Sequence, residues 1–144
     1  MKKIVVFFLL YLFQSTSSAC TIPVWESLVA KPYQSMEKAD IVFFGKLIEF
    51  NDLTYSEQTV SFEVIEIYKG PKIENVIIRN ILGSSCSKIF IKKDSLYYVY
   101  ATLDTNGNNY IINDRATFIS QKTAAKNNFK LEKTHNKRLW LNVR

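Results

Sequence analysis

The chain has 144 residues, of which 47% are hydrophobic, and a formal net charge of +6. This length is enough for one domain with its own hydrophobic core. The moderate positive charge is not that of a dedicated nucleic-acid-binding protein. No apolar run is long enough to span a membrane as a helix, so no transmembrane segment is expected.

The first nineteen residues have the three parts of a secretory signal peptide. Two lysines come first, an apolar run follows over 4–13, and Ser17 and Ala19 supply small residues before a cleavage point. A buried N-terminal helix is the alternative, but the order of these features favours a signal peptide over 1–19. We therefore expect an exported protein, secreted or periplasmic, whose residues 20–144 form a single domain with a net charge of +4.

If cleavage follows Ala19, Cys20 becomes the first mature residue, and Cys86 is the only other cysteine. Two cysteines in an exported chain indicate one disulfide bond. Closing a loop of this length would stabilise the fold by about 4 kcal/mol if the effect comes from chain entropy. The same bond would hold the new N-terminus against the domain, whereas chain ends usually fray.

Two prolines make residues 20–32 irregular, and a short helix is expected over 33–39. The first strand is predicted over 41–50. Before Gly45 its residues are apolar at both odd and even positions, and after Gly45 apolar and polar residues alternate. A glycine inside such a strand often marks a bulge or a sharp bend.

A polar loop over 51–58 leads to a second strand, predicted over 59–68. The apolar residues of this strand at first take even positions: Val60, Phe62 and Val64. They then move to odd positions, with Ile65 and Ile67. Because a slip of one residue exchanges the two faces of a strand, a bulge or strong coiling is expected here.

The third strand is predicted over 75–82, and 88–91 is a short connecting strand or a turn. The fourth strand, over 96–103, has two faces: Tyr97, Val99, Ala101 and Leu103 on one, and Tyr98 and Tyr100 on the other. Asn106-Gly107 then precedes a short strand over 110–112. Since Asn-Gly tolerates the positive φ angles of a type I′ turn, a hairpin is expected.

From Ser120 onward the pattern becomes helical. Lysines recur at positions 122, 126, 130, 133 and 137, beside an apolar stripe of Phe118, Ala125 and Phe129. This spacing predicts a C-terminal amphipathic helix packed on the sheet with its lysines outward. Five strands in meander order, closed by a helix, favour a mainly β fold of the small antiparallel barrel type.

Side chains that could form a catalytic or metal site are scarce. The single histidine, His135, lies in the polar C-terminal part, no glycine-rich phosphate loop occurs, and no nucleophile motif marks a serine. The carboxylates fall mostly on outward strand positions, which gives no support to paired acid–base catalysis. We therefore expect no enzymatic activity and no cofactor.

Nucleic-acid binding is an alternative for a small barrel, because exposed aromatic rings in a basic groove can stack bases. The residues that fit this description are Tyr98, Tyr100, Lys88, Lys92 and Lys93. However, tyrosine is a common strand residue and lysine protects exposed sheet edges. Export weakens the alternative further, so no nucleic-acid partner is expected.

The mature N-terminus offers chemistry that needs no side chain. An α-amine has a pKa of about 7.7–8.0, so part of it is neutral at physiological pH. The amine and the carbonyl oxygen of Cys20 could chelate a metal in a five-membered ring, and the catalytic zinc of a protease keeps one position open for water. The backbone of Thr21, Ile22 and Pro23 would then lie along the substrate groove.

Several short segments fit one known module when they are taken together: 20–23, 38–46, 62–70, 96–101 and Cys86. Two of them carry patterns, AD-x-VF-x-G over 39–45 and V-x-E-x-YKG over 64–70. In these segments the chain resembles the netrin-like (NTR) module of tissue inhibitors of metalloproteinases and their bacterial relatives. The resemblance covers roughly residues 20–104.

The resemblance implies an OB-fold-like five-stranded barrel with flanking helices, and a disulfide bond from Cys20 to Cys86. It also implies that the amine and carbonyl of Cys20, with Thr21 beside it, bind the zinc of a metalloprotease, which would make the protein a metalloprotease inhibitor. The family typically begins Cys-x-Cys, whereas Ile22 stands in the place of the second cysteine here. One disulfide bond alone would therefore hold the N-terminal segment.

Two other functions stay open. Cys20 could carry a lipid anchor, which would make the protein an envelope lipoprotein. Ser17 stands where a lipoprotein signal has leucine, and lipidation would leave Cys86 unpaired. Alternatively, the protein is a structural or adhesion domain of the envelope, with another extracellular protein as its partner.

Overall fold

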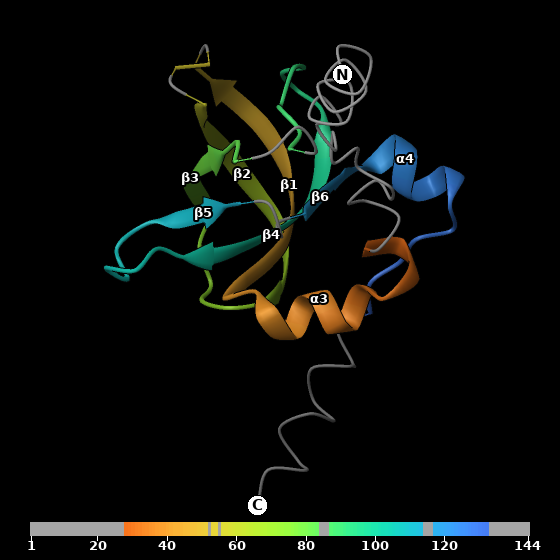
Figure 1. The fold of residues 1–144 in the computed structure, drawn as a ribbon. Helices are drawn as coiled ribbons and strands as arrows, with labels where there is room; N and C mark the ends of the chain where they lie inside the picture. Colours follow the sequence, from red (N-terminus) through yellow and green to blue (C-terminus); the bar gives the residue numbers. More distant parts are fainter. Residues whose placement is uncertain (1–27, 52, 55, 84–86, 114–116, 133–144) are drawn as a thin grey trace, which may run out of the picture.

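The computed structural model describes residues 28–51, 53–54, 56–83, 87–113 and 117–132. In this part of the chain two helices, α3 (Pro32–Lys38) and α4 (Gln121–Lys126), flank six strands. The strands are β1 (Ile41–Phe50), β2 (Glu57–Lys69), β3 (Asn75–Ile81), β4 (Leu96–Leu103), β5 (Tyr110–Ile112) and β6 (Thr117–Ser120). Figure 1 shows the strands wrapped into a barrel, with α3 below it and α4 beside β6.

Five strands close the barrel. β1 pairs with β2, β2 with β3, and β4 with both β1 and β5, all antiparallel, whereas β3 and β5 run parallel. The fold is therefore a mainly β, OB-fold-like barrel, and the predicted fold class is confirmed. The predicted meander order and purely antiparallel pairing are wrong, because β4 returns to β1 and β5 folds back from β4 into the gap beside β3.

The barrel interior is filled by the inward residues of its strands and by Phe90, which comes from the segment between β3 and β4. Phe43 and Phe62 meet edge to face there, with ring centroids 5.5 Å apart. On β4, Tyr97, Val99 and Ala101 are buried in this interior. The predicted division of β4 into two faces is thus confirmed, and the structure decides that the face with Val99 points inward.

A second hydrophobic cluster, called the outer cluster below, covers the outside of β1 and β4. Val42 and Tyr100 are buried in it together with Met36 of α3 and residues that follow α4. Ile41 and Phe43 face the barrel interior instead. β1 is apolar on both parities in its first half because both of its faces are covered.

The bulge predicted in the first strand and the slip predicted in the second are one structural feature. The β1–β2 register shifts next to Gly45 and skips Ile65. A Cβ atom on Gly45 would lie 2.8 Å from the carbonyl oxygen of Glu63, so only glycine fits at this point. Because of the extra residue, Val64 and Ile67 both pack against the barrel interior.

The C-terminal part differs from the prediction. Phe118 lies in β6, which pairs with β4, and it packs on the barrel interior rather than on a helix stripe. α4 is short because Asn128 takes a φ of 53° and the Phe129 N–H donates to the Ala124 carbonyl at 2.9 Å. This Schellman-type ending turns Phe129 into the outer cluster. The C-terminal helix expected from Ser120 is therefore present as α4, but it ends at Lys126 and includes neither Phe118 nor Phe129.

The hairpin between β4 and β5 is confirmed, but its turn is not of type I′. Gly107 has a φ of 70°, whereas Asn106 does not have a positive φ. The Gly107 N–H donates to the Asp104 carbonyl at 2.9 Å, so the tight turn begins at Asp104. Residues 88–91, for which a short strand or a turn was expected, form no strand.

Candidate partner-binding site

The predicted site residues all lie outside the described residues: Cys20, Thr21, Ile22, Pro23 and Cys86. The structure does describe both flanks of Cys86, up to Gly83 and from Ser87 onward. The contacts of these flanks show how the described segment from Ser87 onward is held.

Gln58 of β2 and Asn80 of β3 are the polar residues that the described core buries, with 3% and 2% exposure. They lie directly opposite one another in the β2–β3 ladder. Both side chains point into the barrel end. A buried amide lowers stability unless it is hydrogen-bonded, so the partners of these two side chains matter.

Both amides bind the backbone of the segment that follows Cys86. The Gln58 Nε2 donates to the Phe90 carbonyl at 2.8 Å, and the Phe90 N–H donates to the Gln58 Oε1 at 2.9 Å. The Asn80 Nδ2 donates to the Lys88 carbonyl at 2.8 Å. We call Gln58 and Asn80 the amide clamp. Their side chains give the backbone of residues 88–90 hydrogen bonds of the kind that a neighbouring strand would give.

Phe90 closes the barrel end and is 1% exposed. Its ring stacks on Phe118 with centroids 3.8 Å apart. It meets Phe62 at 5.3 Å and Tyr97 at 5.1 Å, both edge to face. Such aromatic pairs add to the free energy of burial, so the clamped segment is held by its side chain as well as by its backbone.

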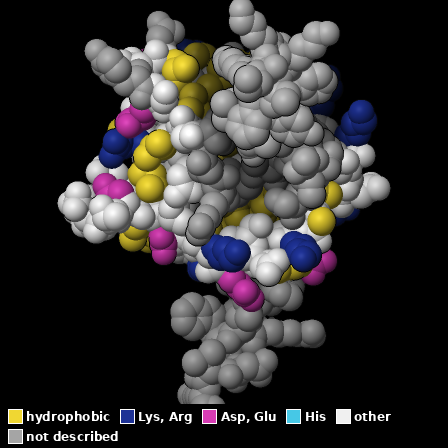
Figure 2. Space-filling view, in the orientation of Figure 1, with side chains coloured by type: hydrophobic (Ala, Val, Ile, Leu, Met, Phe, Trp, Pro, Cys, Tyr) yellow, Lys and Arg dark blue, Asp and Glu magenta, His cyan; other side chains and the backbone are white. Residues whose placement is uncertain are grey.

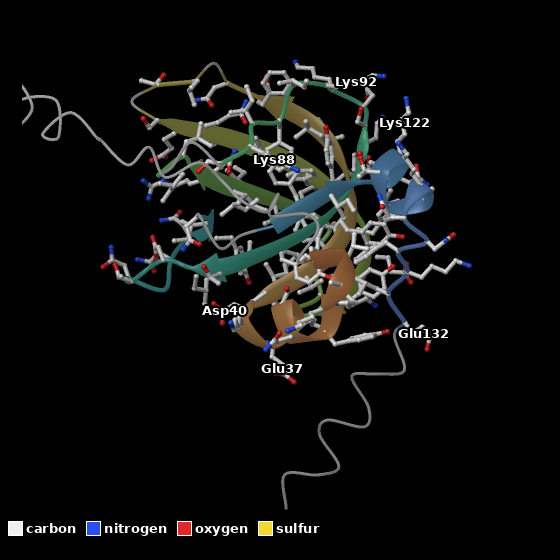
Figure 3. The ribbon with its side chains drawn as sticks, turned by 45° about the vertical axis from the view of Figure 1, so that its right-hand side comes forward. Glu37, Asp40, Lys88, Lys92, Lys122 and Glu132 are labelled. Atoms are coloured by element: carbon white, nitrogen blue, oxygen red, sulfur yellow. The ribbon has the colours of Figure 1, made fainter. Side chains whose placement is uncertain are left out.

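Because Phe90 faces inward, its two neighbours face outward. Ile89 and Ile91 are both exposed, and Ile91 is 73% exposed. Lys88 and Lys92 lie on either side of them, and Figure 3 shows Lys92 projecting at the end of the barrel. The clamp therefore presents apolar side chains to solvent from a fixed backbone, which is typical of a contact surface.

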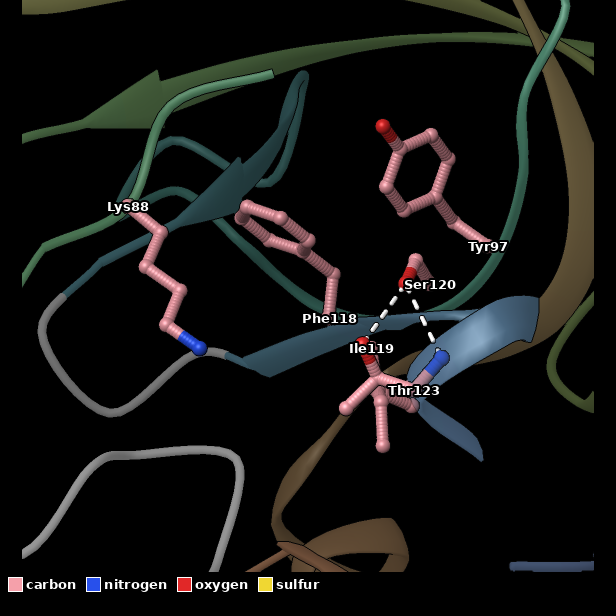
Figure 4. Close-up of a pocket in the computed structure, with 6 residues that line it drawn as sticks. All are labelled: Lys88, Tyr97, Phe118, Ile119, Ser120 and Thr123. Atoms are coloured by element: carbon pink, nitrogen blue, oxygen red, sulfur yellow. Dashed lines mark hydrogen bonds between the residues drawn. The ribbon is translucent and has the colours of Figure 1, made fainter. Parts of the chain in front are cut away.

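A cavity of about 170 Å³ lies beside this segment and is lined by Lys88, Tyr97, Phe118, Ile119, Ser120 and Thr123 (Figure 4). Burial lowers the pKa of the Lys88 amine. The Ser120 Oγ accepts the Thr123 N–H at 3.2 Å and lies 2.9 Å from the Thr123 Oγ1. The Ser120 hydroxyl caps α4, and none of the described residues that line the cavity carries a carboxylate or an imidazole to activate it.

Of the tyrosines considered for base stacking, Tyr100 is buried and Tyr98 is partly buried. Tyr100 is 2% exposed, and the ring of Tyr98 packs on Phe44 at 4.7 Å and on Phe129 at 5.1 Å. Tyr100 belongs to the outer cluster, and Tyr98 packs against it. The barrel therefore does not offer Tyr100 as a stacking surface.

The sequence pattern alone did not identify Gln58 and Asn80 as site residues, since Gln58 falls in the polar stretch predicted as a loop. What marks these two residues in the sequence is that they stand at alternate positions in line with inward residues. Gln58 continues the inward positions of Val60 and Phe62, and Asn80 continues that of Ile78. A polar residue on the inward parity at a strand end therefore marks a side chain that binds backbone.

Within the described residues, no group of three or more His, Cys, Asp and Glu side chains could hold a metal ion. In the same part of the chain, no helix is both long and apolar enough to cross a membrane. No protein-family model and no curated protein matches the chain.

Proposed function

We propose that the chain is an exported, non-enzymatic binding module of the netrin-like kind. Its partner-binding end is the end of the barrel at which the amide clamp holds residues 88–90. A disulfide bond between Cys20 and Cys86 brings the mature N-terminus to this end. The partner is an extracellular protein, and a zinc metalloprotease is the specific candidate.

The amide clamp is the observation that carries the proposal. A disulfide bond can fix a chain end only as firmly as the cysteine to which it is joined. Cys86 stands two residues before Lys88, whose carbonyl accepts the Asn80 amide. A cysteine this close to a clamped backbone is a suitable anchor for a rigid N-terminus, which binding without loss of conformational entropy requires.

The chemistry toward a metalloprotease comes from the backbone of Cys20. Its neutral amine and its carbonyl oxygen would occupy the position that a catalytic zinc keeps open for water. Residues 21–23 would continue along the substrate groove of the protease. Since Ile22 cannot form a second disulfide bond, the bond from Cys20 to Cys86, two residues before the clamped segment, would alone hold this N-terminal segment.

Titration of the exported protein against zinc metalloproteases tests this function. We expect inhibition by the unmodified protein and none by a variant with one extra alanine before Cys20, because the free amine is then displaced from the zinc. Lys122→Gln, a change on α4, is the control and should inhibit like the unmodified protein. Inhibition that survives the extra alanine would rule out chelation by Cys20.

Mass spectrometry of the exported protein separates this proposal from the lipid-anchored alternative. We expect a chain that begins at Cys20 and is two hydrogens lighter than its reduced form, because a disulfide bond joins Cys20 and Cys86. A lipid on Cys20 together with a reactive thiol at Cys86 would contradict the proposal and make the protein an envelope lipoprotein.

A further inference from the structure

Four large hydrophobic residues are exposed at the same end of the barrel: Ile48, Leu53, Ile89 and Ile91. We call them the apolar rim. They come from three segments, namely the end of β1, the β1–β2 loop and the segment between β3 and β4. Figure 2 shows hydrophobic side chains at the surface over the end of β1. Such a gathering is unlike the single exposed hydrophobic residues that are normal on a protein surface.

Backbone hydrogen bonds hold the three segments of the rim together. The Leu82 N–H donates to the Ser56 carbonyl at 2.7 Å, which joins the segment after β3 to the β1–β2 loop. The Asp94 N–H donates to the Leu47 carbonyl at 2.8 Å, and the Leu47 N–H donates to the Ser95 carbonyl at 2.9 Å. With the amide clamp on Phe90, these bonds give the rim a fixed shape.

Exposed lysines lie next to the apolar rim. Lys92 and Lys93 follow Ile91, and the run from 88 to 93 contains no acid, whereas the Lys88 side chain lines the cavity. The nearest carboxylate along the chain, that of Asp94, lies 2.7 Å from the Lys46 amine and is neutralised by it. Glu49 of β1 is the exposed carboxylate next to Ile48.

Acidic side chains of the opposite end are far from the rim. Figure 3 shows Glu37 and Asp40 beside α3 at the bottom of the barrel, whereas Lys92 lies at its top. The α3 end therefore carries exposed acids together with the exposed Lys31 and Lys38, whereas the rim end carries exposed isoleucines together with Lys92 and Lys93.

We propose that the apolar rim docks on the surface of an anionic lipid bilayer. The isoleucines and Leu53 enter the boundary between headgroups and acyl chains, and the lysines bind the anionic headgroups. The rim consists of projecting side chains from three loops rather than a groove. Projecting apolar side chains with lysines among them fit the surface of a bilayer. This surface is flat and deformable, with an apolar interior and negatively charged headgroups.

This inference goes beyond the proposed function. It uses residues 48, 53 and 88–93 and requires neither the amine of Cys20 nor a protease. It also differs from lipidation, because no covalent anchor takes part. A protein that fails to inhibit proteases would therefore not contradict bilayer binding by the rim. A protein that fails to bind bilayers would likewise not contradict protease inhibition.

Sedimentation with vesicles tests the proposal, using exported protein shown by mass spectrometry to carry no lipid. We expect binding to mixed phosphatidylcholine and phosphatidylglycerol vesicles, weaker binding in high salt and little binding to pure phosphatidylcholine. Ile89→Ser with Ile91→Ser should lower the partition coefficient about tenfold or more, because the apolar area that enters the bilayer is lost. Lys92→Gln with Lys93→Gln should lower it roughly tenfold.

Matched controls lie on the outer face of β2 and β3, where Ile65 and Ile77 are exposed to a similar degree. Ile65→Ser with Ile77→Ser should leave vesicle binding unchanged. Leu53→Ser is a second rim variant on a different segment and should also weaken binding.

Equal binding by the Ile89/Ile91 and the Ile65/Ile77 variants would overturn the proposal, as would an absence of binding to anionic vesicles. Loss of protease inhibition in the Ile89/Ile91 variant, with vesicle binding unchanged, would assign the rim to a protein contact instead.

Discussion

The Tyr100 hydroxyl is buried in the outer cluster and has no hydrogen-bond partner among the residues that the structure describes. Burial raises the pKa of this phenol, because its ionised form would be poorly solvated, and the nearby phenols of Tyr33 and Tyr98 raise it further. Tyr68 in the same cluster differs, since its hydroxyl donates to the Glu66 Oε2 at 2.7 Å. The two tyrosines thus form a natural pair for comparison.

Tyr100→Phe should leave the free energy of unfolding unchanged or raise it by up to about 1 kcal/mol, because it removes an unsatisfied buried group. Tyr68→Phe should lower it by about 1 kcal/mol, because a hydrogen bond is lost. Urea denaturation of both variants measures the difference. A loss of stability in Tyr100→Phe as large as that in Tyr68→Phe would mean that the Tyr100 hydroxyl has a partner in solution.

Gln58→Glu tests the amide clamp at the scale of one functional group. The substitution keeps the size of the side chain but removes the donor to the Phe90 carbonyl and buries a carboxylate. At neutral pH the free energy of unfolding should fall by about 3 kcal/mol or more. Part of the loss should be recovered in acid, where the buried carboxyl is protonated and can donate again.

The matched control for this variant is Gln121→Glu, at the exposed start of α4. It introduces the same charge on the surface and should change stability by no more than about 0.5 kcal/mol. Urea denaturation at neutral and acid pH measures both variants. Equal stability of the two variants would show that the clamp does not hold residues 88–90 in solution.

At the scale of the strands, the bulge beside Gly45 gives the clearest prediction. A Cβ atom there would lie 2.8 Å from the Glu63 carbonyl oxygen and 2.9 Å from the Phe43 ring. Gly45→Ala should therefore lower the free energy of unfolding by about 1–3 kcal/mol through overpacking. The backbones of β1 and β2 would have to move apart at the bulge to make room for the methyl group.

Gly107→Ala is the comparison for Gly45→Ala, because a Cβ atom on Gly107 would meet nothing within 4 Å. Its φ of 70° alone opposes the substitution, which should destabilise by about 1 kcal/mol. Thermal and urea denaturation should rank Gly45→Ala as the less stable variant. The opposite order would mean that β1 and β2 can adjust at the bulge with little loss of free energy.

β1, β4 and β5 begin and end at the predicted residues. For β1 and β4 the apolar residues mark the strand clearly, because one parity faces the barrel interior and the other faces the outer cluster. The C-terminal segment was predicted poorly. A pattern of lysines and apolar residues at helical spacing also fits a strand followed by one helical turn, and only the free edge of β4 decides that Phe118 joins β6.

For the molecule as a whole, buried tyrosines predict a loss of stability in alkali. Burial raises the pKa of five phenols: Tyr68, Tyr97, Tyr98, Tyr100 and Tyr110. In the unfolded chain these groups ionise near a pKa of about 10. Since the unfolded state loses its protons first, the stability that they contribute is complete below about pH 10 and falls as the pH rises further.

Urea midpoints measured across the alkaline range test this linkage. The midpoint should be steady up to about pH 9 and should decline above about pH 10. The double variant Tyr68→Phe, Tyr100→Phe should decline less steeply, because two of the linked phenols are absent. An unchanged slope in the double variant would assign the alkaline loss to other groups.

The amino-acid sequence by itself determined the β character of the chain, the boundaries of three strands and the two faces of β4, because each follows from local periodicity, and the glycine at position 45 indicated a bulge or a bend. Only the tertiary structure decided that β5 lies parallel to β3, that the outer cluster covers β1, and that Gln58 and Asn80 hold residues 88–90. These features join residues far apart in the sequence. No local pattern specifies such pairings, since they depend on which surfaces meet once the barrel has closed.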